Sequence, residues 1–188
     1  LLARWQVDLR RFGQVEVQYA FQANHRQEFE ATRQSVEGPQ YDFLLRTHAF
    51  DGRWTQPRLP LGRATLEGEA GLSLSAQDNV YAGLPLIPNH RALTFGVFGI
   101  ERLLLTHGLI EVGGRYDHQE RATFLTRSAF DRHAARGTLD DTVCAPTDAS
   151  ARCDQRWDAG SFSVGAVLRA PDDALELRRR ILLAFERA

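Results

Sequence analysis

Histidine and aspartate side chains in the second half of the chain could hold a metal ion. Asp131 precedes His133 by two residues, and Asp140 and Asp141 follow. Imidazole and carboxylate are groups that zinc accepts as ligands. We therefore predict that His133 and Asp131 form a metal-capture site. The alternative is that both are ordinary solvated loop residues, since none of the six histidines pairs with another at a typical ligand spacing.

Two cysteines offer a second kind of chemistry. Cys144 and Cys153 lie nine residues apart in a polar stretch that contains proline and aspartate. This spacing predicts a local disulfide that stiffens an exposed loop in an oxidising compartment. Two free thiols are the alternative. A zinc site is disfavoured, because there is no Cys-x-x-Cys pattern and no histidine between the cysteines.

The chain lacks the motifs of common enzymes. Gly-x-Ser-x-Gly, Walker-type loops and His-Glu-x-x-His are all absent. Serine, aspartate and histidine do occur together between Ser128 and His133, but this combination is frequent by chance. We expect no enzyme. The remaining enzymatic alternative is an outer-membrane protease or lipase on a small barrel.

Composition excludes several classes of protein. The 188 residues carry 23 basic and 24 acidic side chains, which argues against a nucleic-acid partner. A hydrophobic content of 43% is too high for a disordered chain. The mean hydropathy is −0.35, and no apolar run is long enough for a transmembrane helix. A membrane β-barrel remains compatible, because its strands alternate between apolar and polar residues.

Period-two alternation dominates the chain. Val15, Val17, Tyr19 and Phe21 alternate with polar residues, as expected for a strand with one apolar face. The pattern recurs in residues 4–10, 64–75, 110–117, 161–169 and 175–185, and less regularly in 41–50 and 93–100. These segments predict about eight strands and no amphipathic helix.

The predicted connections alternate between short and long. Short turns at residues 11–13, 106–108 and 171–173, and a longer stretch at 51–60, alternate with loops at about 30–40, 80–90 and 127–158. Residues 14–30 and 63–79 are also longer than globular strands. Both features favour a membrane barrel. A soluble β-sandwich or β-barrel binding module is the alternative, because it shows the same alternation.

Several strings resemble a known family. They are Glu111–Asp117, which contains Gly-Gly-Arg-Tyr-Asp, Phe162–Leu175, Phe21–Phe29, Gln77–Gly83 and Pro85–His90. In this order they resemble the barrel of TonB-dependent outer-membrane receptors. In that family a Gly-x-Arg-Tyr-Asp strand runs out to a large extracellular loop, and a Ser-x-Gly strand returns. Phe21–Phe29 and Leu86–His90 look most like the branch that includes zinc and other metal-uptake receptors.

The resemblance implies an all-β fold: an antiparallel meander of about eight long strands, part of a transmembrane β-barrel. Residues 1–188 would be a fragment of a single receptor barrel domain, with the plug domain and the remaining strands outside it. Such a receptor imports a scarce nutrient, first of all a metal ion or metal chelate, across the outer membrane of a Gram-negative bacterium. No cofactor is expected in this segment. A passive porin-like barrel is the alternative within the same membrane.

The resemblance also implies partners and a role for each face. The partners would be outer-membrane lipid, the plug domain, TonB through the plug, and the transported small ligand. The predicted lumen-facing residues are Glu16, Gln18, Gln22, Asn24, Arg26, Glu67, Glu69, Glu111, Arg115 and Asp117. The predicted lipid-facing residues are Trp5, Val15, Val17, Tyr19, Phe21, Leu72, Leu74, Val112, Tyr116, Val164 and Leu168. Taken alone, the segment should form a curved sheet with two open edges or a small closed barrel.

Overall fold

The structure, a computed structural model, describes residues 1–29, 38–83, 87–139, 141–168 and 179–187. Antiparallel strands make up nearly all of it, so the predicted all-β class is confirmed. Eight strands correspond to the eight predicted segments: β1 (Leu2–Asp8), β2 (Gln14–Glu28), β3 (Tyr41–Thr55), β5 (Ala64–Gly83), β6 (Asn89–Leu105), β7 (Gly108–Thr126), β9 (Ser150–Leu168) and β10 (Arg179–Arg187). The parts of the predicted last strand before Arg179 lie outside the described residues.

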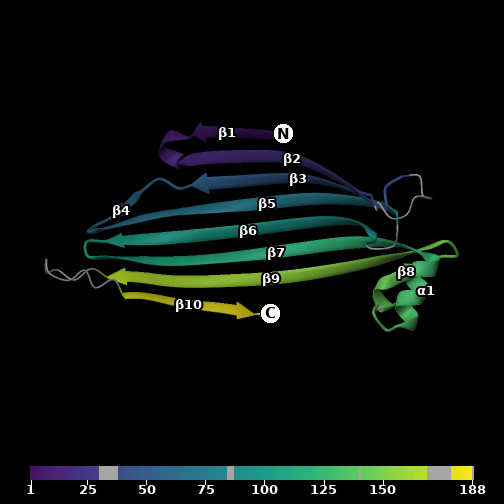
Figure 1. The fold of residues 1–188 in the computed structure, drawn as a ribbon. Coiled ribbons are helices and arrows are strands. Elements are labelled where there is room, and N and C mark those ends of the chain that lie inside the picture. The colour runs from purple at the N-terminus through teal and green to yellow at the C-terminus, as the bar shows by residue number, and fades with distance from the viewer. Residues whose placement is uncertain (30–37, 84–86, 140, 169–178, 188) are drawn as a thin grey trace.

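The strands form one open meander (Figure 1). Their order is β1-β2-β3-β5-β6-β7-β9-β10, and two short strands, β4 (Leu59–Leu61) and β8 (Cys144–Pro146), pair with β5 and β9. β1 and β10 each have a single neighbour, so the sheet has two open edges. Of the two forms expected for the segment alone, the structure has the open curved sheet.

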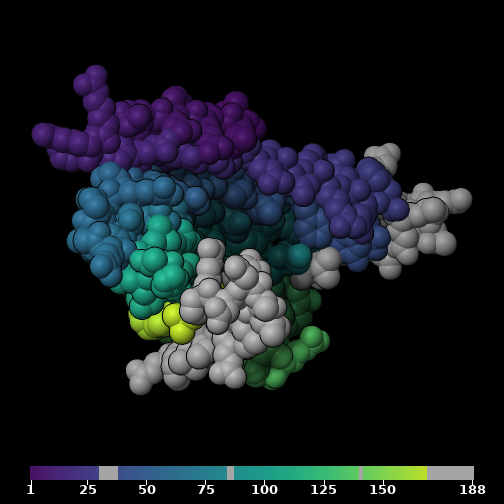
Figure 2. All heavy atoms as spheres, turned by 90° about the vertical axis from the view of Figure 1, so that its left-hand side faces the viewer, coloured from purple at the N-terminus to yellow at the C-terminus, as the bar shows by residue number. Residues whose placement is uncertain are grey.

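The sheet is curved, and its two faces differ in exposure. Viewed along the strands, β1 and β2 lie at the top, β5 at the side and β9 at the bottom of an arc (Figure 2). On β6 the large residues Leu93, Phe95 and Val97 are exposed, whereas the intervening Ala92 and Gly96 are buried. Side chains on the inner side of an arc converge and shield one another. The face that holds Ala92 is therefore the concave face, and the face that holds Phe95 is the convex face.

The two ends of the sheet carry different connections. At one end lie tight turns, such as the single turn η1 (Arg10–Phe12) that precedes Gly13, whose φ of 88° favours glycine. At the other end lie the β2–β3, β5–β6 and β7–β9 connections (Figure 1). The turn predicted at 171–173 and most of the loop predicted at 30–40 lie outside the described residues.

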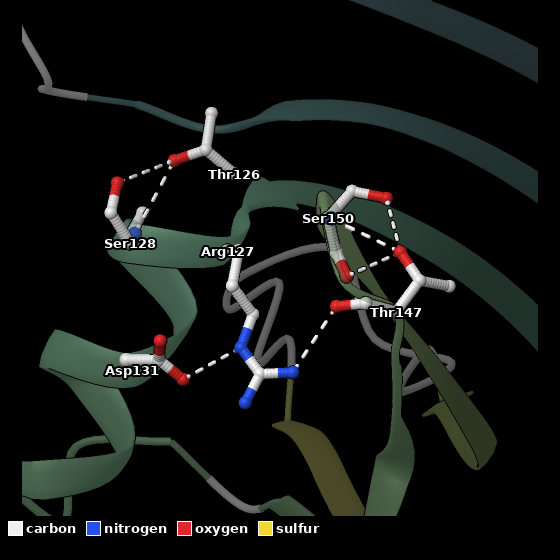
Figure 3. Close-up of polar contacts among 7 residues, drawn as sticks. Thr126, Arg127, Ser128, Asp131, Thr147 and Ser150 are labelled. Carbon is white, nitrogen blue, oxygen red and sulfur yellow. Dashed lines mark hydrogen bonds and ion pairs between the residues drawn. The ribbon is translucent and has the colours of Figure 1, made fainter.

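The segment between β7 and β9 corrects one expectation. Residues 127–158 were expected to form a loop, yet they contain the helix α1 (Arg127–Ala135), the turn η2 (Asp141–Val143), β8 and the first part of β9. Thr126 caps α1, because its Oγ1 accepts a hydrogen bond from the amide of Ala129 at 3.3 Å (Figure 3). A nine-residue helix with one buried side chain, Phe130, is too short to show a clear 3.6-residue period.

A small apolar core holds this segment together. Leu125, Phe130, Ala151 and Cys153 pack against one another, and a disulfide joins Cys153 to Cys144 with the Cα atoms 3.9 Å apart. The disulfide therefore links two directly paired residues of a β-hairpin rather than closing a free loop. In this part of the chain Arg127 connects helix and hairpin, with bonds to Asp131 at 2.9 Å and to the carbonyl of Thr147 at 3.1 Å (Figure 3).

Candidate functional site: the two faces of the sheet

All ten residues predicted to face a lumen lie on the concave face. Directly paired residues of an antiparallel sheet point to the same side. Glu16 pairs with Arg53, which pairs with Gly71, and this row continues through Phe98 to Arg115. Rows two residues apart share the face, so the register places the other nine with Ala92 and Gly96. The lumen itself remains a prediction, because the sheet is open.

Ser75 and its partners Ala49 and Thr94 divide the strands into two parts. We call the part toward the tight turns the turn half and the part toward α1 the loop half. In the turn half, most charges on the concave face form ion pairs. Those between different segments are Arg4–Glu16 at 2.5 Å, Arg53–Glu69 at 3.6 Å, Arg58–Glu67 at 2.9 Å and Arg102–Glu111 at 2.6 Å, and Arg115 pairs with Asp117 along β7 at 2.6 Å. This surface is polar, and its arginines are paired.

Gly96 makes room for the centre of this network. Arg115 donates to both oxygens of Asp117 and, at 3.1 Å, to the hydroxyl of Ser73 on β5. A Cβ atom at position 96 would collide with all three side chains. Glycine at this point of β6 therefore lets a guanidinium from β7 lie across the strand and bond to β5.

The loop half of the concave face is different. Tyr41, Phe43 and Tyr81 form an aromatic group, with ring centroids 6.4 Å and 4.8 Å apart for the two successive pairs. Beside it Asn79 is only 7% exposed, and its Nδ2 atom has no hydrogen-bond partner among the described residues. The Nε atom of Arg121 on β7 is likewise buried and unpartnered there. This region combines aromatic rings with unsatisfied donors.

The convex face carries an apolar band, most of it in the turn half. Its members are Trp5, Val7, Val15, Val17, Tyr19, Phe21, Phe50, Trp54, Leu66, Leu72, Leu74, Leu93, Phe95, Val97, Leu103, Ile110, Val112, Tyr116, Phe162, Val164 and Leu168. All eleven residues predicted to face lipid belong to it. Many are well exposed, among them Leu168 at 64%, Trp5 at 57% and Phe95 at 39%. None of them is covered by a second layer of described residues.

The band crosses the strands obliquely. On β2 the first charged or titratable residue beyond it is His25, two residues past Ala23, and the pairing row of Ala23 reaches β9 at Asp154. On β9 the band already ends at Asp158, four residues closer to the turns than Asp154, so the edge of the band shifts by six residues between β2 and β9. A shift of six residues over five strand-to-strand steps corresponds to an angle of about 40°, at roughly 3.3 Å per residue and 4.8 Å per strand.

Beyond the band, the convex face becomes charged. Asp78 pairs with Arg91 at 3.0 Å, and Glu120 pairs with Arg156 at 3.1 Å. These pairs line a hollow of about 670 Å³. Five arginines and three carboxylates line this hollow, so its formal charge is positive.

His118 and Asp158 lie just outside the band on β7 and β9. The Nδ1 atom of His118 is 2.8 Å from a carboxylate oxygen of Asp158, and the hydroxyl of Tyr116 donates to the same oxygen at 2.5 Å. The hydrogen bond to Asp158, reinforced by Glu120, raises the pKa of His118. The bonds from Tyr116 and His118 lower the pKa of Asp158.

The proposed metal ligands do not converge. Asp131 binds Arg127 at 2.9 Å, and His133 bonds through Nδ1 to the hydroxyl of Thr138 at 3.1 Å. Two residues apart on α1, their side chains leave the helix in nearly opposite directions. Among the described residues, no three His, Cys, Asp or Glu side chains form a group that could hold a metal ion.

Sequence reasoning missed Asn79, Arg121 and the aromatic group. Their odd residue numbers were a usable signal, since Arg121 continues the odd-numbered polar series of Arg115 and Asp117 on the same strand. Odd or even numbering does not show which residues of different strands lie side by side. Asn79 and Arg121 are 42 residues apart in the sequence, and only the pairing of β5, β6 and β7 places them two strands apart on the same face.

Comparisons with known proteins leave the functional argument to this geometry. No protein-family model, curated protein or solved structure matches the chain. In the described residues there is also no helix with the length and hydrophobicity needed to cross a membrane. The functional argument therefore rests on the polarity and exposure of the two faces of the sheet.

Proposed function

We propose that this chain is part of the wall of an outer-membrane β-barrel of the TonB-dependent receptor class, which imports a small nutrient. The observation that carries the proposal is the oblique apolar band on the convex face, opposite a concave face of paired charges. Soluble sheets place apolar residues inside and polar residues outside. A membrane barrel has the reverse arrangement, because lipid surrounds it and water fills it.

The angle of the band supports the same reading. Strands of membrane barrels are tilted by about 35–45° from the membrane normal. A lipid layer would then cover each strand over a window that shifts steadily from one strand to the next. The shift of about 40° between β2 and β9 has this size. A binding module in water has no reason to arrange its exposed apolar residues along such a line.

The lengths of the strands and the position of the charges on the convex face also support placement in a membrane. A tilted strand needs about 9–11 residues to cross the hydrocarbon layer. β5, β7 and β9 have 20, 19 and 19 residues, so their loop halves would extend beyond it. The convex charges begin where this extension begins, and the disulfide-linked segment with α1 lies at the same end. A disulfide is suited to the oxidising exterior.

Import coupled to TonB rests on the resemblance of Glu111–Asp117 and Phe162–Leu175 to receptor strands. A porin-like channel would have the same kind of barrel wall, so the two faces of the sheet do not separate a receptor from a porin. The resemblance also places metal ions and metal chelates first among cargoes. The pair His133 and Asp131 adds no support for a bare metal ion, because the two side chains diverge.

Membrane placement is tested on the full-length protein with two neighbouring positions on β6. Val97→Cys lies on the convex band and Thr94→Cys on the concave face. Each cysteine carries a fluorophore, and the protein is reconstituted in vesicles whose acyl chains are brominated, because bromine quenches fluorophores in contact with it. We expect strong quenching at position 97 and little at position 94. Equal, weak quenching at both positions would contradict the proposal and favour a soluble module.

Transport is tested in cells that contain the full-length protein with and without TonB. Uptake of isotopically labelled zinc and ferric citrate is measured, with a strain lacking the protein as control. Uptake that requires both the protein and TonB is expected. Uptake that requires the protein but persists without TonB would identify a passive porin-like channel instead.

A further inference from the structure

We propose that Asn79 and Arg121 form a binding site for an oxyanion group, such as a carboxylate or phosphate, of a small ligand on the concave face. The proposal rests on the proposed function, because it names the chemical class of cargo that this wall would contact. Its starting point is a pair of buried donors, Asn79 Nδ2 and Arg121 Nε, that have no hydrogen-bond partner among the described residues.

Unsatisfied buried donors are costly and rare in folded proteins. Leaving such a group without a partner costs about 1–3 kcal/mol, and more when it is charged. Elsewhere on the concave face the arginines of the turn half have carboxylate partners, such as Glu69 for Arg53 and Glu111 for Arg102. Arg121 has no ion pair in the described part of the chain, so its positive charge is not neutralised there. Donors without acceptors are complementary to a ligand rich in acceptors.

The register places the two donors on one face, two strands apart. Asn79 lies on β5 in the pairing row of His90 and Thr123, and Arg121 lies on β7 in the next row on that face, with Ala92 and Gln77. Two strand spacings of roughly 4.8 Å separate β5 from β7. Ala92 is 6% exposed and carries only a methyl group, so the surface is low beside Arg121, and a small ligand with several oxygen atoms could span the diagonal to Asn79.

The surroundings strengthen interactions with an anion. On the β3 side lie Tyr41, Phe43 and Tyr81, and on the β9 side lies the apolar core under α1. Apolar walls reduce solvent screening, which strengthens a charge-assisted hydrogen bond.

The remaining charges near this site are mainly positive. Arg26 is paired with Glu28 at 2.6 Å, whereas Arg132 and Arg136 of the α1 segment form no ion pair among the described residues. Both line a hollow of about 430 Å³ together with Tyr81 and Leu125. An anionic ligand approaching from the loop end would therefore pass further positive charge before it reaches Arg121.

The proposed oxyanion site would not bind a bare metal cation. A metal ion needs several acceptor ligands, and among the described residues no three His, Cys, Asp or Glu side chains form a group that could hold one. A metal could reach this surface inside an anionic complex, where the complex supplies the oxygen atoms that Asn79 and Arg121 bind.

The test measures citrate binding to the purified full-length protein in detergent by isothermal titration calorimetry. We expect Asn79→Leu and Arg121→Gln each to weaken citrate binding about tenfold, the loss expected for a hydrogen bond involving a charged group. Arg53→Gln is the matched control, because it removes an arginine from the same face in the turn half and should leave citrate affinity unchanged. Glucose, a neutral ligand, should show no dependence on Arg121.

A second readout reports the contact itself. In a protein labelled with ¹⁵N-arginine, the Nε–Hε signal of Arg121 should shift on addition of citrate and of inorganic phosphate, and should not shift with Zn²⁺ alone. An unmoved signal would overturn the proposal, and so would unchanged citrate affinity in the variant that combines Asn79→Leu with Arg121→Gln. Water would then satisfy both donors. Lipid quenching at position 97 is measured on the same variants. Retained quenching with lost citrate binding supports the site, whereas absent quenching contradicts membrane placement independently.

Discussion

The turn half and the loop half of the same strands differ in polarity, most clearly on the convex face. In the turn half the convex face is apolar, and the concave face carries paired charges such as Arg102–Glu111. In the loop half the convex face carries charges such as Arg91–Asp78, and the concave face carries aromatic rings and the apolar core under α1. On the convex face the apolar band gives way to charges along the same strands. Under the proposed function, this is where the strands would pass from lipid into water.

The comparison also separates two ways of stabilising a single-layer sheet. The turn half has no covering element among the described residues, and under the proposed function lipid would cover its apolar side chains. The loop half is covered locally by α1, which packs Phe130 against Leu125 and Ala151. The first half should therefore depend on lipid and the second on its own side chains and disulfide.

The largest effect should come from a charge in the apolar band. Leu74→Arg introduces a guanidinium on the convex face, whereas Ser75→Arg, one residue later, introduces it on the concave face. We expect Leu74→Arg to lower the free energy of unfolding in lipid vesicles by about 2–4 kcal/mol, the cost of arginine near the bilayer midplane. Ser75→Arg should cost much less. Equal losses in urea unfolding would remove the distinction between the two faces.

A smaller and local effect is expected for the disulfide. Replacing Cys144 and Cys153 by serine opens a loop with a sequence separation of nine residues. The chain-entropy model gives about 2–3 kcal/mol for such a loop. Hydrogen exchange should increase in residues 127–158, while the turn half of β5 and β6 keeps its protection. Faster exchange throughout the sheet would show that the two halves are not independent.

The smallest effect on stability is expected when a paired arginine, Arg102, or an unpaired one, Arg121, is replaced. Arg102→Gln leaves Glu111 without its partner at 2.6 Å, and both side chains are more than a third exposed. Solvent screening limits the expected loss to about 0.5–1 kcal/mol in the free energy of unfolding. Arg121→Gln should cost nothing measurable without ligand, because no carboxylate loses a partner. A larger loss for Arg121→Gln would reveal a structural role and weaken its assignment to ligand binding.

Much of this architecture follows from local pattern. Alternation of Val15, Val17, Tyr19 and Phe21 with polar residues is visible in the sequence, because successive side chains of a strand point to opposite sides. For this reason all ten residues that were predicted to face a lumen share one face in the structure. The short helix α1 escaped prediction because nine residues and one buried side chain provide too little periodicity.

The sequence by itself determined the strands, their two chemically distinct sides and the pairing partners available to the two cysteines, because these depend on residues close together along the chain. Only the tertiary structure decided which side is convex, how the apolar band crosses the strands, and that Asn79 and Arg121 lie two strands apart on the same face. Curvature and register arise from contacts between distant strands. No local pattern of period two contains that information.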